Sequence, residues 1–307
     1  MEDYPRTILD FEERFHSEAS CREYLWQLRW PDGFRCPRCG GSKAWWLRRD
    51  LYRCSHCDRQ TSVTAGTIFH RSRTPLRVWF RALWYVTNQK HGVSALGLQR
   101  ALGLGSYHTA WTWLHKLRTA MVRPGRDRLA GTIEVDEAYL GGVKPGKPGR
   151  GAAGKALVLV AAQVEGTRIG RIRLRRIADA SAASLEQALT ETVEPGSVIR
   201  TDEWSGYTSN LKTLGYHHQV VHKGAEVGDS RLPRVHRVVA LLKRWLLGTH
   251  QGAVRASHLD YYLDEFTFRF NRRTSRSRGK LFYRLVQQAA TVSPITESEI
   301  AGGRTLG

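Results

Sequence analysis

The sequence predicts a multidomain α+β protein, and three observations support this prediction. Two Cys-x-x-Cys pairs lie close together within the first 60 residues. Apolar residues then recur at helical spacing between residues 74 and 121. From Gly131 onward the pattern changes to the period of two that is typical of β-strands. A chain of 307 residues with 41% hydrophobic content is long enough to form two or three such domains.

The charge of the chain indicates a polyanionic partner. Its formal net charge is +20, and residues 231 to 284 alone hold 13 Lys and Arg against 3 Asp and Glu. Nucleic acid is the leading candidate for such a partner. The first residues lack the pattern of a secretory signal, and the apolar run that begins at Ala156 is too short to span a membrane. We therefore expect a cytoplasmic protein without a membrane partner.

The first motif is a predicted zinc ribbon, with the spacing C-x2-C-x14-C-x2-C at Cys36, Cys39, Cys54 and Cys57. Each Cys-x-x-Cys turn directs two thiolates at one point, and two turns supply the four sulfurs that a tetrahedral Zn²⁺ ion prefers. Four free thiols or a redox-active pair are the alternatives. The spacing favours a structural Zn²⁺ ion that all four cysteines bind.

A region with the outline of a helix-turn-helix follows the ribbon. A short helix, a turn from Gly103 to Gly105 and a second helix from Ser106 follow one another. In such a motif the second helix enters the major groove of DNA, so that Tyr107, His108 and Thr112 would face the bases. An ordinary pair of packed helices has the same outline, and its aromatic residues would then belong to the core.

The next part of the chain has the element order of an RNase H-like α/β domain. Alternating and apolar runs predict strands at 131–140, 155–166 and 171–178, a helix at 181–193 and a further strand at 197–207. Three strands, a helix, a strand and then helices is the order found in that fold. The change of period near Gly131 places a domain boundary just before the first strand.

Two aspartates in this domain are candidate catalytic residues. Asp136 falls within the first predicted strand, and Asp202 falls at the end of the strand expected beside it. Together their carboxylates could hold a pair of divalent ions for an in-line phosphoryl displacement. The alternative is that each aspartate caps a turn. Glu137 and Glu203 follow directly, and because neighbours on a strand point to opposite faces, we expect them to lie outside this site.

A glycine-rich loop separates the first two predicted strands. The segment 141–155 contains six Gly and two Pro, a composition that does not pack into regular structure. Its cationic side chains would let the loop close on a DNA backbone, and we expect DNA contacts from Lys144, Lys147 and Arg150.

These motifs together resemble those of bacterial insertion-sequence transposases of the DDE class, in the group that joins an N-terminal zinc ribbon to an RNase H-like catalytic domain. The matching segments are the ribbon from Cys36 to Cys57, "VDEAYLGG", "TDEWSGY", "VHRVVALLKRWLLGTHQG" and "YLDEFTFRFNRR". The resemblance implies Mg²⁺- or Mn²⁺-dependent 3′-end cleavage of the element and transfer of that end into target DNA. It also implies binding to terminal inverted repeats, a homodimer or larger synaptic complex, and association with the bacterial nucleoid.

The resemblance leaves the third metal ligand open. In related transposases this ligand lies on the helix after the second aspartate, seven residues before a Lys, and here no Asp or Glu occurs from Ser230 to Leu259. Alignment on Lys243 puts His236 in the ligand position, two helical turns away on the same face. An ordinary packed or solvated histidine is the alternative. Lys243 would contact the phosphate beside the scissile bond, and we expect DNA contacts from Arg237 and Arg244 of the same helix.

A second candidate for the third acid is Glu265. With Arg269 and Arg272 it forms a trio at positions i, i+4 and i+7 of a predicted helix, and the trio recurs in some relatives. The spacing suits an ion pair within the helix and a further Arg for a phosphate. We interpret Glu265 as a supporting or structural residue more readily than as a metal ligand.

Five segments and one function follow from these patterns. The segments are a helical region at 1–33, the zinc ribbon at 34–64, the helix-turn-helix-like DNA-binding region at 70–124, the RNase H-like domain at 130–285 and a C-terminal tail at 286–307. The expected function is that of a transposase. Its alternatives are a catalytically decayed zinc-ribbon DNA-binding protein and an RNase H-like nuclease that does not join strands.

Overall fold

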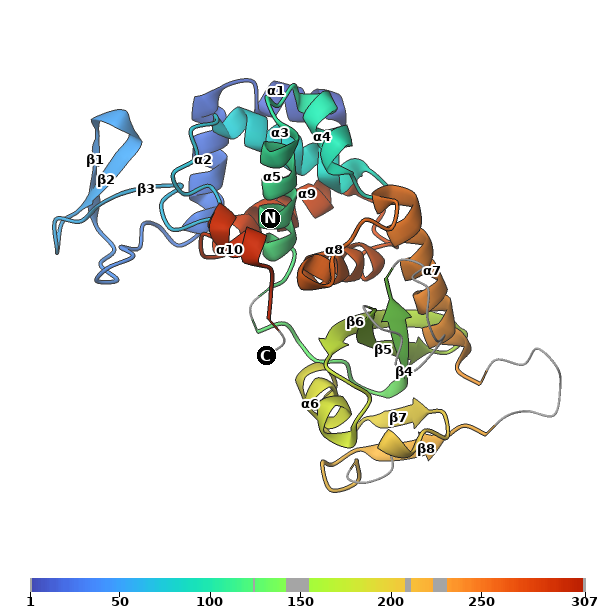
Figure 1. Cartoon of the computed structure of the whole chain (residues 1–307). Helices are drawn as coiled ribbons and strands as arrows, with labels where there is room; N and C mark the ends of the chain where they lie inside the picture. Colours follow the sequence, from blue (N-terminus) through green and yellow to red (C-terminus); the bar gives the residue numbers. More distant parts are fainter. Residues whose placement is uncertain (1, 124, 142–154, 208–210, 223–230, 306–307) are drawn as a thin grey trace. The chain divides into compact units, whose positions relative to one another are not determined.

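The computed structural model describes residues 2–123, 125–141, 155–207, 211–222 and 231–305. The chain divides into two compact units (Figure 1). Unit 1 comprises Met1–Pro124 and Ser275–Ile300, and unit 2 comprises Gly125–Thr274 and Ala301–Gly307. Each unit therefore uses two separate stretches of the chain.

The zinc ribbon is a three-stranded antiparallel sheet within unit 1. Its strands are β1 (Ala44–Leu47), β2 (Leu51–Cys54) and β3 (Gln60–Ser62), in the order β1-β2-β3. A short 3-10 turn, Arg48–Asp50, joins β1 to β2. The preceding chain forms two helices, α1 (Ile8–Arg14) and α2 (Glu18–Arg29). Helix α2 carries the ribbon, because Trp30, at its C-terminal cap, packs edge-on against Tyr52 of β2.

The rest of unit 1 is a helical cluster. Its elements are α3 (Leu76–Asn88), α4 (Ala95–Leu102), α5 (Tyr107–Ala120) and, after unit 2, α9 (Arg278–Ala289). Aromatic rings fill its core, and the rings of Trp79 and Trp113 stack with 3.6 Å between their centroids. The residue that precedes α3, Pro75, provides no side-chain hydrogen bond to the first turn of the helix. Instead the carboxylate of Glu18 in α2 accepts hydrogen bonds from the backbone N–H groups of Leu76 and Arg77.

Unit 2 is built on a five-stranded mixed sheet with the order β6-β5-β4-β7-β8. The strands are β4 (Thr132–Leu140), β5 (Ala156–Glu165), β6 (Arg168–Ile177), β7 (Val198–Thr201) and β8 (His217–Val220). The first three pair antiparallel, whereas β7 pairs parallel with β4 and β8 parallel with β7. This order and these directions are those of an RNase H-like sheet and confirm the predicted fold class.

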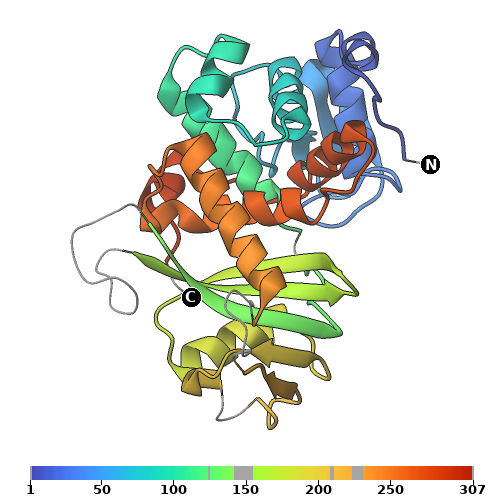
Figure 2. The ribbon, with the colours of Figure 1, turned by 90° about the vertical axis from the view of Figure 1, so that its right-hand side faces the viewer.

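Helices cover both faces of this sheet. On one face α7 (Pro233–His250) and α8 (Leu259–Phe270) share an apolar core with β4, β5 and β6 (Figure 2). On the other face α6 (Ala182–Thr192) packs against β5 and β6, in a core that also includes residues of β4 and Tyr207 of the 3-10 turn Ser205–Tyr207. A further 3-10 turn, Ala256–His258, leads into α8. Within the described ranges, no helix has both the length and the apolar character required to cross a membrane.

Two predictions about the end of the chain are corrected. The RNase H-like domain was expected to reach residue 285, but the second unit gives way to the first at residue 275, and α9 packs on α3 in unit 1. The segment 286–307 was expected to be a tail. Residues 286–289 instead complete α9, a short helix α10 spans Glu297–Gly302, and the guanidinium of Arg304 pairs with Asp264 of α8 at 2.5 Å. These contacts are long-range, so no local pattern signals them.

The close approach of α9 to the N-terminal segment makes a stability prediction. A Cβ atom added at Gly279 would overlap the carbonyl oxygen of Pro5, so Gly279→Ala must separate the two segments. We expect this variant to lower the free energy of unfolding by about 1–3 kcal/mol in urea denaturation. The matched control is Gly105→Ala, also in unit 1, where an added Cβ meets nothing within 4 Å. Equal unfolding midpoints for both variants would contradict the predicted overlap.

Candidate functional site

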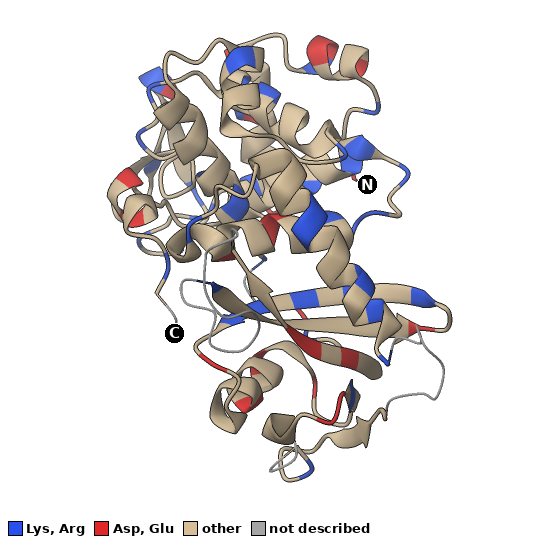
Figure 3. Ribbon diagram, turned by 45° about the vertical axis from the view of Figure 1, so that its right-hand side comes forward, with Lys and Arg blue, Asp and Glu red and all other residues tan. Residues whose placement is uncertain are grey.

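The central strand of unit 2 and the helix above it bring the first two candidate residues together. Asp136 lies on β4 and His236 in the first turn of α7, and the His236 Nε2 atom lies 3.2 Å from the Asp136 Oδ2 atom. The other oxygen, Asp136 Oδ1, accepts a hydrogen bond of 2.8 Å from the backbone N–H of Glu137. Acidic residues of the sheet lie beneath the basic residues of α7 (Figure 3).

Asp202 follows β7, the parallel neighbour of β4. The register pairs Glu134 with Arg200, so Asp136 and Asp202 each lie two residues further along these strands. The Asp202 Oδ1 atom accepts a hydrogen bond of 3.0 Å from the backbone N–H of Trp204, which fixes the turn after the strand. Burial raises the pKa of Asp136, and the nearby charge of Asp202 adds to this, whereas His236 lowers it.

The three predicted ligands approach one another without forming a closed metal cluster. Within the part of the chain that the structure describes, only the four cysteines place three or more donor atoms within 4.8 Å of one another. Asp136, Asp202 and His236 nevertheless have donor atoms that suit a divalent cation, two carboxylates and one imidazole. Asp136 lies in the middle of β4, Asp202 directly after β7, and His236 in the first turn of α7.

Glu134 is a site residue that the sequence did not reveal. Its side chain is 2% exposed, and one carboxylate oxygen accepts from the backbone N–H groups of Arg234 and Val235 at 2.7 and 3.0 Å. The other oxygen pairs with the Arg234 guanidinium at 2.9 Å. Glu134 therefore anchors the first turn of α7, directly before His236 and on the same strand face as Asp136. Its only sequence signal is its position two residues before Asp136.

The two glutamates that follow the aspartates have other partners. Glu137 accepts a hydrogen bond from the hydroxyl of Tyr207, on the face that α6 covers. Burial raises the pKa of Tyr207 well above its ordinary value, so this phenol stays protonated. Glu203 pairs with His222 and Arg231, each at 2.8 Å, and the hydrogen bond from His222 lowers the pKa of Glu203. Neither glutamate points at the Asp136 carboxylate.

The exposed face of α7 carries the predicted cations. Arg237, Lys243 and Arg244 are exposed, as is His236, whereas Val238 and Leu242 lie in the core. Lys243 and Arg244 also line a cavity of about 400 Å³ beside the ends of β4 and β5, together with Lys155. The helix thus presents a basic surface on the side away from the sheet. Lys144, Lys147 and Arg150 lie outside the described residues.

Glu265 belongs to the packing of α8. Its side chain is 1% exposed, and its Oε1 atom binds the Arg269 guanidinium through two nitrogens at 2.8 Å each. The guanidinium of Arg272 instead lies over the ring of Phe268, with 4.1 Å between the guanidinium carbon and the ring centroid. Among the described residues, Glu265 joins no group of three metal-donor side chains.

The predicted zinc centre is assembled in unit 1. The Sγ atoms of Cys36 and Cys57 lie 3.6 Å apart, as do those of Cys39 and Cys54. A tetrahedral Zn²⁺ ion with Zn–S bonds of about 2.3 Å requires sulfurs about 3.8 Å apart. The residue after each Cys pair, Gly40 or Asp58, has a positive φ and donates its backbone N–H to the carbonyl of the first cysteine of that pair. The two Cys-x-x-Cys turns therefore have the same backbone conformation, and the distances between their sulfur atoms are close to those that a Zn²⁺ ion requires.

The structure has two helices joined by a turn where the helix-turn-helix was predicted, but one of the three residues expected to face bases is buried. Helices α4 and α5 pack together, Gly103 ends α4 with a φ of 62°, and the Ser106 side chain caps α5. Tyr107 and His108 are exposed at the start of α5. Thr112 is only 7% exposed, so it cannot face a base. Its position on the inner side of α5 depends on which neighbours cover that helix, which the local pattern does not contain.

Comparisons with known proteins agree with these features. The model of the transposase zinc-ribbon domain matches residues 16–60, and that of the ISXO2-like transposase domain matches residues 128–271. A protein in transposable element ISH50 of Halobacterium salinarum is 27% identical over 300 residues, which cover 90% of this chain and 98% of the relative. The solved Mos1 strand transfer complex has a chain that is 12% identical, with coverage of 74% of this chain and 79% of that chain. Its TM-score of 0.26 is too low to support an argument.

The anchoring of α7 by Glu134 makes a prediction that can be measured without any substrate. Glu134→Gln keeps the size of the side chain but removes the charge that binds Arg234 and two backbone N–H groups. We expect it to lower the free energy of unfolding by about 1–3 kcal/mol, because buried donors lose a charged acceptor. Urea denaturation measures this loss, and the NMR signals of the His236 imidazole report the movement of α7.

The control for this prediction is Glu203→Gln, which breaks an exposed ion pair with Arg231. Exposed pairs contribute less than about 1 kcal/mol, so this variant should remain close to the original protein. If Glu134→Gln is no less stable than Glu203→Gln and leaves the His236 signals in place, Glu134 does not anchor the helix.

Proposed function

We propose that the chain is an insertion-sequence transposase of the DDE class, since it matches the models of the transposase zinc-ribbon domain and of the ISXO2-like transposase domain. It binds the terminal inverted repeats of its element, cleaves the DNA at the 3′ ends and transfers those ends into target DNA. The observation that carries the proposal is the contact between Asp136 of β4 and His236 of the basic helix α7. Asp202, directly after the parallel strand β7, lies beside them.

In this proposal the carboxylates of Asp136 and Asp202 and the Nε2 atom of His236 hold Mg²⁺ or Mn²⁺. When bound, a pair of such ions activates the attacking oxygen and stabilises the leaving oxygen of an in-line displacement. The protein contributes the orientation of the ligands, because Glu134 fixes the helix that carries His236. Glu265 has a supporting role through Arg269, since its carboxylate is buried and already paired.

The basic face of α7 is proposed to hold the DNA strand that is cut. Lys243 lies seven residues after His236 on the same exposed face, a distance of about 10.5 Å along a helix, which is within the reach of neighbouring phosphates. Arg237 and Arg244 extend this surface, and Lys144, Lys147 and Arg150 of the glycine-rich loop would close on the same backbone. The ribbon, with Tyr107 and His108 of α5, would bind the element ends. Two ends must meet for joining, so we propose a homodimer or a larger synaptic complex.

The first test is strand transfer with purified protein and labelled element ends. We expect Asp136→Asn and Asp202→Asn each to reduce strand transfer by at least about 100-fold. The two carboxylates would act as one catalytic unit, so the loss of either removes most of the activity of the unit. Asp179→Asn is the matched control, since that exposed carboxylate accepts hydrogen bonds from Ser181 and Ser184 at the start of α6.

The outcomes also separate the alternatives. Cleavage without joining by the unaltered protein would identify a nuclease, and binding without cleavage would identify a decayed DNA-binding protein. Asp136→Asn and Asp202→Asn proteins as active as the original would show that the two carboxylates have no catalytic role.

A second prediction concerns the unusual ligand. Imidazole is neutral and suits Mg²⁺ less well than a carboxylate does, so the protein should be more active in Mn²⁺ than in Mg²⁺. His236→Glu should reduce this preference, and His236→Ala should lower activity in both metals. Strand transfer in each metal and Mn²⁺ binding by electron paramagnetic resonance measure the effect. Equal activities in the two metals for both the original protein and His236→Glu would show that His236 does not bind the ion.

A further inference from the structure

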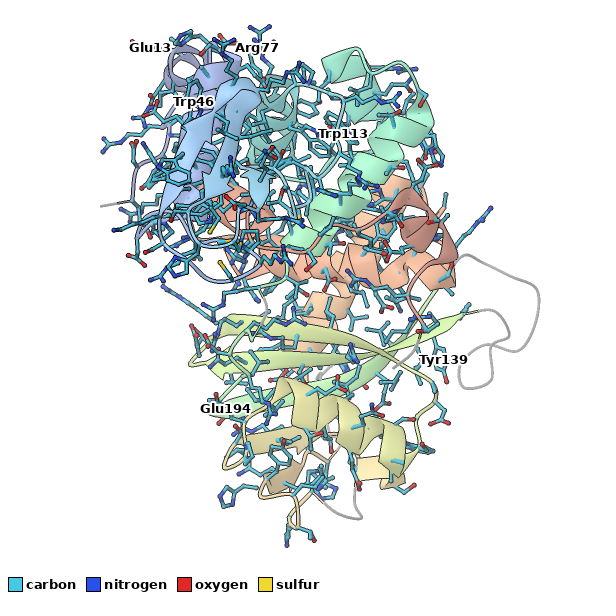
Figure 4. The ribbon with its side chains drawn as sticks, turned by 90° about the vertical axis from the view of Figure 1, so that its left-hand side faces the viewer. Glu13, Trp46, Arg77, Trp113, Tyr139 and Glu194 are labelled. Atoms are coloured by element: carbon cyan, nitrogen blue, oxygen red, sulfur yellow. The ribbon has the colours of Figure 1, made fainter. Side chains whose placement is uncertain are left out.

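We propose that the β1–β2 hairpin of the zinc ribbon binds unpaired DNA bases by stacking them on Trp45 and Trp46. The inference rests on the proposed function, since it assumes that the chain acts on DNA. The two side chains are 59% and 64% exposed, although large aromatic side chains are normally buried to a much greater extent (Figure 4, where Trp46 is labelled). They are adjacent in β1, so they project from opposite faces of the hairpin.

Among the described residues, neither indole forms a hydrogen bond or a contact with another ring. Trp45 lies opposite Arg53 in the strand register, and Trp46 lies opposite Tyr52. It is Tyr52 that attaches the hairpin to the rest of unit 1, because its ring packs against Trp30 and Phe34 with centroid distances of 5.6 and 6.0 Å. The hairpin is also fixed by its zinc ligands. The two tryptophans are therefore available to a partner.

The tip of the hairpin is held in one conformation. Arg49 and Asp50 have φ values of 63° and 57°, in the left-handed region that residues other than glycine rarely adopt. The carboxylate of Asp50 pairs with Arg22 of α2 at 2.7 Å, which stabilises this turn. Arg48 and Arg49 are consequently exposed at a fixed place beside the indoles. A surface that is ordered before binding loses little conformational entropy when it binds.

The positive charge of the ribbon favours a polyanion as its partner. Residues 35–59 contain seven Lys and Arg against two Asp. Both aspartates are already paired, Asp50 with Arg22 and Asp58 with Arg53. The other six cations are exposed and form no ion pair with a described residue: Arg35, Arg38, Lys43, Arg48, Arg49 and Arg59. Phosphates would therefore find several cations around the two indoles.

The combination of exposed aromatic rings and cations favours unpaired bases over a closed duplex. Cations bind the phosphates of both forms, so charge alone gives no preference for a single strand. An indole can stack on a base only where the flat face of the base is exposed. In a duplex the neighbouring base pairs cover both faces of each base. A surface made for duplex backbone alone would gain nothing from two exposed tryptophans. DNA that is being cut and joined offers unpaired bases at its ends.

Binding of two probes by the full-length protein tests this proposal. The probes are a fluorescently labelled single-stranded oligonucleotide and a duplex of the same sequence. We expect the double variant Trp45→Ala, Trp46→Ala to bind the single strand about 10- to 100-fold more weakly and the duplex less than about twofold more weakly. The double variant Trp45→Tyr, Trp46→Tyr should retain most of the single-strand affinity. Saturation with the single strand should quench tryptophan fluorescence in the original protein.

The controls separate this proposal from misfolding and from the proposed function. Zinc content reports whether the ribbon is intact, and Leu9→Ala removes another exposed apolar side chain of unit 1, 75% exposed, without touching the ribbon. Equal losses for both probes, or no loss for either, would overturn the stacking proposal. A change in oligomeric mass without a change in DNA binding would also overturn it and assign the hairpin to contacts between copies. In each of these cases strand transfer by the original protein remains as the separate test of function.

Discussion

The buried carboxylate of Glu134 is the interaction on which the candidate catalytic arrangement depends. A carboxylate that is 2% exposed is stable only when donors surround it, and the first turn of α7 supplies three hydrogen bonds. The positive end of the helix and the guanidinium of Arg234 are both neutralised by this one group. Because the anchor lies on β4, the start of α7 is fixed relative to the strand that carries Asp136. Residues about 100 positions apart in sequence thus come to share one site.

The period of two along β4 then separates the acidic side chains by role. Glu134 and Asp136 lie on the face that α7 covers, whereas Glu137 lies on the opposite face and binds Tyr207. The parallel pairing of β7 with β4 brings Asp202, directly after the short strand β7, beside Asp136 in the middle of β4. A shift of β7 by one residue along β4 would turn Asp202 to the opposite face of the sheet and separate it from Asp136.

Local chemistry explains which features the sequence could predict. The strands β4 to β6, helix α6 and the cysteine turns each have a strong pattern of their own, and the structure contains all of them. Strand β8 was missed because "HHQV" has neither an apolar run nor the usual alternation. The anchoring role of Glu134 and the burial of Thr112 were missed for a different reason, since both depend on residues far away in sequence. The position of His236 was predicted only through a resemblance, and the structure places it beside Asp136.

The lack of acidic residues in α7 is consistent with the electrostatics of the site. Burial raises the pKa of Asp136, Asp202 adds to that effect, and His236 opposes it. A carboxylate at position 236 would reverse this last contribution and would place three negative charges together, an arrangement that needs a bound cation to be stable. An imidazole adds no negative charge there, and its Nε2 atom lies 3.2 Å from the Asp136 Oδ2 atom. The first turn of α7 meets Glu134 and Asp136, and the exposed face of the helix would, in the proposed function, meet DNA phosphates. The sequence has no Asp or Glu between Ser230 and Leu259, so the basic surface of α7 is not offset by acidic residues of its own helix.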